Sequence, residues 1–86
     1  MKNKILKIFS GRSNPTLAKN IASTLNQELG KVSIRTFADG EIWVKYEENI
    51  RGCDIFIIQS TNGPSENIME LALMIDAAVR ASADTV

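Results

Sequence analysis

Histidine is absent from the 86-residue sequence, cysteine occurs once, and basic and acidic side chains are equal in number. Without histidine, the chain lacks the side chain that most often exchanges protons near neutral pH and most often ligates zinc. The single cysteine, Cys53, excludes a disulfide within the chain, which suits a reducing cytoplasm. Ten Lys and Arg residues balance ten Asp and Glu residues, so no bulk charge attracts nucleic acid or an anionic membrane. We therefore expect a cytoplasmic protein without nucleic-acid or membrane partners.

Long apolar segments, internal repeats and low-complexity linkers are also missing. The longest apolar runs, near Ile55–Ile58 and Leu71–Ile75, are far shorter than the ~20 residues of a membrane-spanning helix. Lys7 interrupts the apolar residues that follow the basic N-terminus, so we expect no export signal there. A chain of 86 residues forms one globular unit at most, which excludes a large two-domain enzyme.

The pattern of apolar residues predicts four strands. Branched and aromatic side chains favour strands at Ile5–Phe9, Val32–Phe37, Ile42–Glu47 and Ile55–Ile58. Asp39-Gly40 separates the second and third strands, and this dipeptide favours a hairpin. The fourth run is apolar at every position, which is typical of a strand buried on both faces. We therefore expect that strand at the centre of a sheet.

A first helix is predicted after the first strand. Asn14 is a suitable N-cap, and Pro15 suits the first helical position, where its missing N–H has no intrahelical partner. Apolar residues then recur at helical spacing as far as Leu29. Gly30 follows where a left-handed residue would end the helix.

A second helix is predicted from an N-cap at Ser65 to about Ala83. Its polar residues occupy roughly a third of the circumference: Glu66, Glu70, Asp76 and Arg80. The remainder is apolar and needs cover on more than one side. Asp84–Val86 begins what reads as another strand, so we expect the chain to be the first portion of a larger domain or of an oligomer.

Two strand-to-helix junctions, Ser10–Asn14 and Ser60–Ser65, are candidate anion-binding loops. A helix N-terminus presents free N–H groups that can bind an anion. Neither junction contains a glycine-rich phosphate-binding motif. Ordinary connecting loops are therefore the favoured interpretation.

The hairpin tip combines Phe37 with the carboxylates of Asp39 and Glu41. An aromatic face beside acceptor oxygens suits a purine and its amine. Spacing alone favours the simpler interpretation, in which Asp-Gly forms a turn and Phe37 belongs to the core. Arg51, in a turn with Asn49, is a candidate phosphate ligand, although a solvated arginine is the commoner case.

Several segments, taken in order, carry a family resemblance that periodicity does not supply: Lys7–Gly11, Arg35–Glu41, Glu48–Asp54, Ile57–Ser60 and Met69–Ala83. They resemble the first quarter of ribose-phosphate diphosphokinase, the phosphoribosyl pyrophosphate synthetase. The resemblance implies a three-layer α/β domain similar to the type I phosphoribosyltransferases, with the order β-α-β-β-β-α and a following strand cut off. Residues 1–86 would then be the N-terminal part of the N-terminal synthetase domain, with no second domain present.

The resemblance also implies a reaction. The family transfers diphosphate from Mg-ATP to ribose 5-phosphate, giving 5-phosphoribosyl 1-diphosphate and AMP for nucleotide biosynthesis. It implies a transferase that uses Mg²⁺ and forms a homo-oligomer, a hexamer in the family. The metal-binding histidine and the catalytic loops of the family come later in its sequence. We therefore expect no catalytic residue and no metal ligand in this segment, and no activity of the segment alone. A non-catalytic assembly or regulatory module of synthetase-like fold is the alternative.

Residue by residue, the resemblance assigns two binding regions. Phe37, Asp39 and Glu41 match the loop with which one subunit receives the adenine of ATP bound mainly by its neighbour. This match reverses the simpler interpretation of the hairpin tip.

The second region is regulatory. Asn49, Arg51 and Ser82 match positions that in many members help form a site for phosphate or ADP at a subunit interface. Two departures from the family pattern stand beside these matches. Ala38 replaces a frequent serine, and the loop from Ser60 to Asn67 is one residue shorter than in many members.

Overall fold

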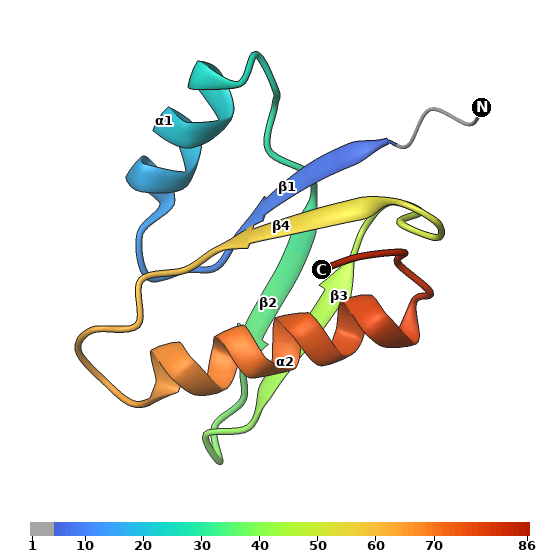
Figure 1. Ribbon diagram of the computed structural model, residues 1–86. Coiled ribbons are helices and arrows are strands. Elements are labelled where there is room, and N and C mark those ends of the chain that lie inside the picture. Colours follow the sequence, from blue (N-terminus) through green and yellow to red (C-terminus); the bar gives the residue numbers. More distant parts are fainter. Residues whose placement is uncertain (1–4) are drawn as a thin grey trace.

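The computed structural model describes residues 5–86, in which four strands and two helices follow one another in the order β-α-β-β-β-α (Figure 1). The elements are β1 (Leu6–Ser10), α1 (Pro15–Thr24), β2 (Val32–Thr36), β3 (Ile42–Tyr46), β4 (Asp54–Ile58) and α2 (Glu66–Arg80). The predicted element order and the α/β class are confirmed. The expectation of no export signal concerns the N-terminus, where residues 1–4 lie outside the described residues.

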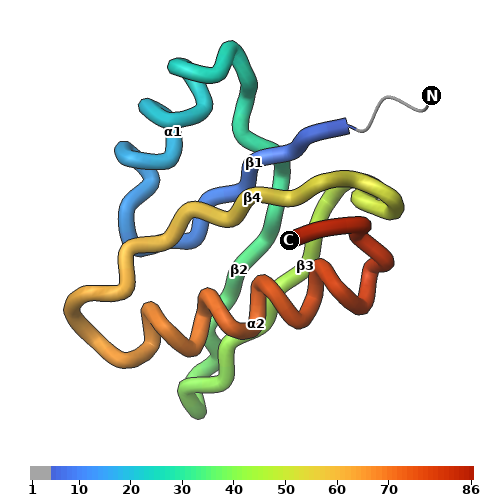
Figure 2. The backbone as a smooth tube through the Cα atoms, in the orientation of Figure 1, coloured from blue at the N-terminus to red at the C-terminus, as the bar shows by residue number. Residues whose placement is uncertain are grey.

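The strands form two pairs rather than one sheet. β1 runs parallel to β4, with Leu6 opposite Asp54 and Ser10 opposite Ile58. β2 and β3 form the expected antiparallel hairpin, which crosses the direction of the β1–β4 pair in the view of Figure 2. Helix α1 packs against β1, whereas α2 packs against both β3 and β4. The hydrophobic core therefore lies where the strand pairs and α2 meet.

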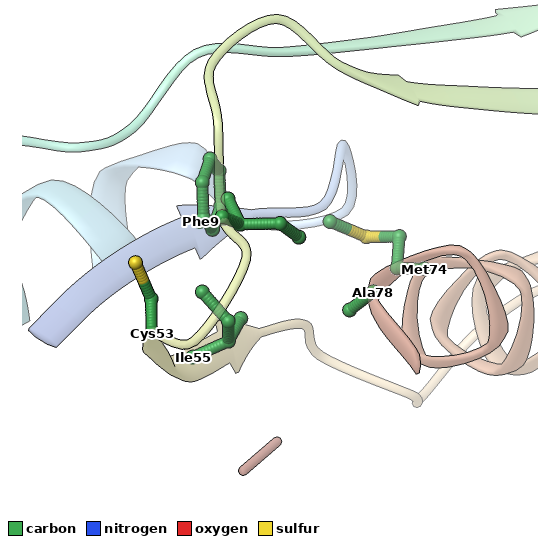
Figure 3. Packing of buried hydrophobic residues seen from close by; sticks show 6 residues of the cluster. Phe9, Cys53, Ile55, Met74 and Ala78 are labelled. Atoms are coloured by element: carbon green, nitrogen blue, oxygen red, sulfur yellow. The ribbon is translucent and has the colours of Figure 1, made fainter. Parts of the chain in front are cut away.

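The core is built from side chains of four different segments. Its buried members are Phe9, Ile50, Cys53, Ile55, Met74 and Ala78. Figure 3 shows the side chains from β1, β4 and α2 converging on one interior space. Cys53 is a free and buried thiol, and it packs in the core as a small hydrophobic side chain. Burial of these apolar groups is what holds the two strand pairs to one helix.

Helix α1 begins as predicted but ends earlier. The Asn14 side-chain oxygen accepts a hydrogen bond from the Leu17 N–H at 3.1 Å, with Pro15 at the first helical position. The helix ends at Thr24, and Asn26 adopts the left-handed conformation at φ 55°. Leu29 then pairs with Ile8 of β1. The predicted end at Leu29 is wrong, because backbone pairing with β1 replaces the last helical turn.

Gly30 therefore does not end the helix as predicted, and it lies instead beside β1. Its N–H donates to the carbonyl of Ile8 at 2.7 Å. A Cβ atom at this position would lie 2.4 Å from Cε1 of the Phe9 ring. The missing side chain lets the strand-like segment approach β1 closely.

The expectation that Ile55–Ile58 is buried on both faces is wrong for this chain. Ile55 is fully buried, but the side chain of Phe56 is 50% exposed. Successive strand residues point to opposite faces, and in this structure only the face toward α2 and the hairpin is covered. Beyond β4, the predicted strand at Asp84–Val86 is represented by one parallel bridge, between Asp54 and Thr85.

Helix α2 ends at Arg80, three residues before the predicted end, and it differs from its prediction in two further details. Ser65 precedes it, but the Ser65 side chain makes no capping hydrogen bond. Glu70, assigned above to the polar surface, is only 4% exposed, because it lies in one row with the buried residues Met74 and Ala78. Other apolar side chains of α2 are exposed, with Met69 57% and Val79 60% accessible. Neither helix in residues 5–86 has the length and apolar character needed to cross a membrane.

Candidate functional site

Polar side chains gather where the parallel strands β1 and β4 reach their carboxyl ends. The N–H and hydroxyl of Ser13 both donate to the side-chain oxygen of Gln59, at 3.2 and 2.7 Å. The side-chain amide of Asn14 donates to the Ser60 hydroxyl at 3.2 Å. The two junctions that the sequence presented as separate candidate anion sites therefore contact each other. Their polar groups are engaged in mutual hydrogen bonds, which agrees with the favoured interpretation as connecting loops.

Glu70 lies at the centre of this cluster, and its burial was missed by sequence reasoning. One carboxylate oxygen accepts from the Arg12 N–H at 2.7 Å and from the Gln59 side-chain amide at 2.9 Å. The other accepts from Nε of Arg12, also at 2.7 Å. A buried carboxylate is tolerated only with such donors around it. The available sequence signal was the spacing of four residues between Glu70, Met74 and Ala78.

The hairpin tip is an ordered turn with an exposed ring. The N–H of Phe37 donates to the Glu41 carbonyl at 2.8 Å, and the Gly40 N–H donates to the Phe37 carbonyl at 2.9 Å. A side-chain oxygen of Asp39 accepts from the Glu41 N–H at 3.0 Å. Gly40 has φ 88°, a conformation that glycine adopts without strain. Phe37 is 48% exposed, so the alternative that it belongs to the core is wrong in this structure.

A groove of about 450 Å³ separates this tip from helix α2. One wall consists of Gly40, Glu41 and Ile42, and the other includes Glu66 and Met69. The tip therefore stands beside an open, partly apolar surface. The lower part of Figure 1 shows the tip of the β2–β3 hairpin near the N-terminal end of α2.

The three residues assigned to regulation gather near the opposite end of α2. A side-chain oxygen of Asn49 accepts from the Arg51 N–H at 3.1 Å. The Gly52 N–H donates to the Ser82 carbonyl at 2.9 Å, which joins the turn before β4 to the residue that follows α2. Ser82 has the left-handed φ of 65°. A 15-residue helix is roughly 22 Å long, so the hairpin tip and this turn are well separated.

Within residues 5–86, no three His, Cys, Asp or Glu side chains are grouped so that they could hold a metal ion. The described residues therefore do not fit an Mg²⁺ site.

The fold and the polar cluster define an α/β domain with a parallel strand pair, its loops joined at the carboxyl ends of the strands. A family model described as the N-terminal domain of ribose phosphate pyrophosphokinase matches residues 6–86. The chain belongs to this family.

Named relatives and a solved structure agree with this assignment. The chain is 59% identical to ribose-phosphate pyrophosphokinase 2, chloroplastic, of Spinacia oleracea, over 98% of this chain and 22% of the relative. It is 56% identical to the ribose-phosphate pyrophosphokinase of Bacillus subtilis, over 98% of this chain and 27% of the relative. Phosphoribosylpyrophosphate synthetase from Mycobacterium smegmatis superposes with a TM-score of 0.90 at 43% identity, covering 94% of this chain and 28% of that one. The chain thus spans about a quarter of the length of these proteins.

Proposed function

We propose that this chain serves as the N-terminal part of the N-terminal domain of a ribose-phosphate diphosphokinase. That enzyme transfers diphosphate from Mg-ATP to ribose 5-phosphate and releases AMP, in nucleotide biosynthesis. The observation that carries the proposal is the family match over residues 6–86, together with identities above 50% to relatives that bear this name.

The hairpin tip is the proposed adenine-binding element. Phe37 offers a half-exposed ring, and the exposed carboxylates of Asp39 and Glu41 can accept hydrogen bonds from the purine amine or a ribose hydroxyl. Hydrogen bonds within the turn hold these groups together before ligand binds. The ATP is held mainly by a neighbouring subunit, so the tip adds one wall to a site completed by an oligomer, a hexamer by analogy with the family.

The turn at Asn49–Gly52 with Ser82 is the proposed regulatory element for phosphate or ADP. Arg51 is exposed there and carries the positive charge that such an anion requires. The backbone bond from Gly52 to Ser82 brings the three assigned residues into one region, which supports a shared role.

Catalysis itself is assigned to residues outside this segment. Phosphoryl-group transfer depends on metal ions and cations that neutralise charge, and Mg²⁺ would be bound elsewhere in the enzyme. We propose a cytoplasmic location for this chain; the spinach relative is named as a chloroplastic protein.

The proposal is tested by assaying the complete protein that carries this segment with ATP, Mg²⁺ and radiolabelled ribose 5-phosphate. We expect labelled 5-phosphoribosyl 1-diphosphate and one AMP per product. The 86-residue chain alone is expected to make none. A complete protein that folds and forms oligomers without making product would instead be the non-catalytic assembly or regulatory module.

A further inference from the structure

Arg12 joins two parts of the molecule that are far apart in sequence. Its backbone N–H and its Nε each donate to an oxygen of Glu70 on α2, both at 2.7 Å. The outer nitrogen Nη2 of the same guanidinium donates to the Thr36 hydroxyl at 2.8 Å. One side chain therefore connects the buried carboxylate of the polar cluster with the end of β2.

The inner end of this connection is firmly held. Glu70 is 4% exposed, and the Gln59 side-chain amide supplies a further donor to it. Gln59 is in turn held by the N–H and hydroxyl of Ser13. Because the guanidinium is planar and rigid, fixing Nε also fixes the direction in which Nη2 points. The polar cluster thus sets the direction of the hydrogen bond that the Thr36 hydroxyl accepts.

The outer end of the connection lies beside the hairpin tip. Thr36 is the last residue of β2, opposite Ile42, and Phe37 follows it directly. Residues 34–44 form the tip half of the hairpin. Within residues 5–86, the hydrogen bond from Arg12 to Thr36 is the only one that connects this half to another element. The other end of the hairpin is held by Tyr46, whose hydroxyl donates to the Met74 carbonyl.

A groove, and not a packed side chain, borders the hairpin tip on the side of α2. The groove of about 450 Å³ lies between Gly40–Ile42 and the first turns of α2. A hydrogen bond one residue before Phe37 is therefore well placed to set the position of the ring.

We infer that Arg12 is a positioning residue for purine recognition: held by Glu70, it fixes Thr36 and thereby orients Phe37 for stacking on adenine. The inference rests on the proposed function of the hairpin tip. Arg12 itself does not contact the nucleotide, and its contribution to ATP affinity passes entirely through Thr36.

A purely structural role would be to neutralise Glu70, and two substitutions separate the two roles. Thr36→Val removes the accepting hydroxyl with little change of shape and leaves the Arg12–Glu70 pair intact. Arg12→Lys keeps a positive charge for Glu70, but a single ammonium group lacks the fork that reaches the carboxylate and Thr36 together. Ser33→Ala is the matched control, because it removes a hydroxyl that bonds to Glu47 at the far end of the same hairpin.

The experiment measures steady-state kinetics on the complete protein that carries this segment, with ATP and ribose 5-phosphate varied in turn. Loss of one hydrogen bond changes an equilibrium by about two- to tenfold. We expect Thr36→Val and Arg12→Lys each to raise KM for ATP by that factor, with kcat and KM for ribose 5-phosphate unchanged. The double variant should be no worse than either single one, because both remove the same bond. Ser33→Ala should match the wild type.

Phe37→Ala, measured in the same series, distinguishes failure of this inference from failure of the proposed function. If Phe37→Ala raises KM for ATP while Thr36→Val and Arg12→Lys leave it unchanged, Arg12 is not a positioning residue and only this inference is overturned. If Phe37→Ala also leaves KM for ATP unchanged, the tip does not bind adenine and both are overturned. Equal rises in the KM for both substrates would likewise indicate a general structural role and overturn the inference.

Discussion

Phe9 and Tyr46 meet edge to face, with ring centroids 4.8 Å apart and ring planes at 79°. This contact joins β1 of the parallel pair to β3 of the hairpin. The Tyr46 hydroxyl also donates to the Met74 carbonyl at 2.7 Å, so the same side chain fastens helix α2 to the hairpin. Phe9 and Tyr46 therefore connect β1, β3 and α2, although β1 and β3 belong to different sheets.

Tyr46→Phe tests the polar part of this arrangement. The ring contact with Phe9 is kept and only the hydrogen bond to Met74 is lost. We expect the free energy of unfolding at pH 7 to fall by about 0.5–1.5 kcal/mol, as measured by urea denaturation of the 86-residue chain. An unchanged midpoint and slope would show that the hydroxyl contributes nothing to stability.

Comparison of the wild type with Tyr46→Phe also gives a prediction for alkaline pH. Burial raises the pKa of Tyr46 from 10.0 to about 12, because the phenolate is poorly solvated in the folded state. The unfolded chain therefore loses this proton first, so the stability tied to the neutral phenol is complete below pH 10 and is lost as the pH rises toward 12. We expect the difference in free energy of unfolding between the wild type and Tyr46→Phe to disappear in this pH range. Urea titrations of both proteins at several pH values measure this difference. A constant difference would contradict the raised pKa.

Gly30→Ala should destabilise the chain by steric overlap. The new Cβ would lie 2.4 Å from Cε1 of Phe9, which must shift within a packed core. We expect a loss of about 1–3 kcal/mol in thermal or urea unfolding. In the double variant with Phe9→Leu, the combined loss should be smaller than the sum of the single losses, because the smaller side chain relieves the overlap. Strict additivity would show that Gly30 is needed for another reason.

Glu70→Ala and Glu66→Ala compare two glutamates that the sequence placed on one polar face. Removing Glu70 leaves Arg12 and Gln59 without their shared acceptor, so we expect a loss of about 2–4 kcal/mol. Glu66 is exposed in the first turn of α2, and its removal should cost less than about 1 kcal/mol. Equal losses in urea denaturation would contradict the central position of Glu70 in the polar cluster.

Substitutions at the hairpin tip address the proposed adenine site in the complete protein. Phe37→Ala should weaken ATP binding by about 1–3 kcal/mol, or roughly fivefold to 150-fold, with little effect on ribose 5-phosphate. Asp39→Asn and Glu41→Gln keep the size of each side chain but replace an acceptor by a donor, so they should reduce the preference for ATP over GTP. Because Phe37 is exposed, the melting temperature of the Phe37→Ala variant should stay close to wild type. Unchanged KM for ATP in that variant would exclude adenine stacking.

Local chemistry explains which parts of the fold could be predicted from the sequence. The Asn14-Pro15 start of α1 and the Asp39-Gly40 hairpin depend on residues close in the chain, and both are present in the structure. The end of α1 depends instead on the pairing of Leu29 with Ile8, and no local pattern contains that contact. The tip residues were assigned through family resemblance, because their spacing alone favoured an ordinary turn.

By itself, then, the sequence determined the order of the elements, the hairpin and the family. Tertiary structure decided that Glu70 is buried, that Phe56 is half exposed, and that Arg12 reaches Thr36. Helical periodicity reports which residues share a face, but the burial of that face depends on which element packs against it. Arg12 and Thr36 are 24 positions apart, and only the packing of β1, β2 and α2 in space brings the guanidinium to the hydroxyl.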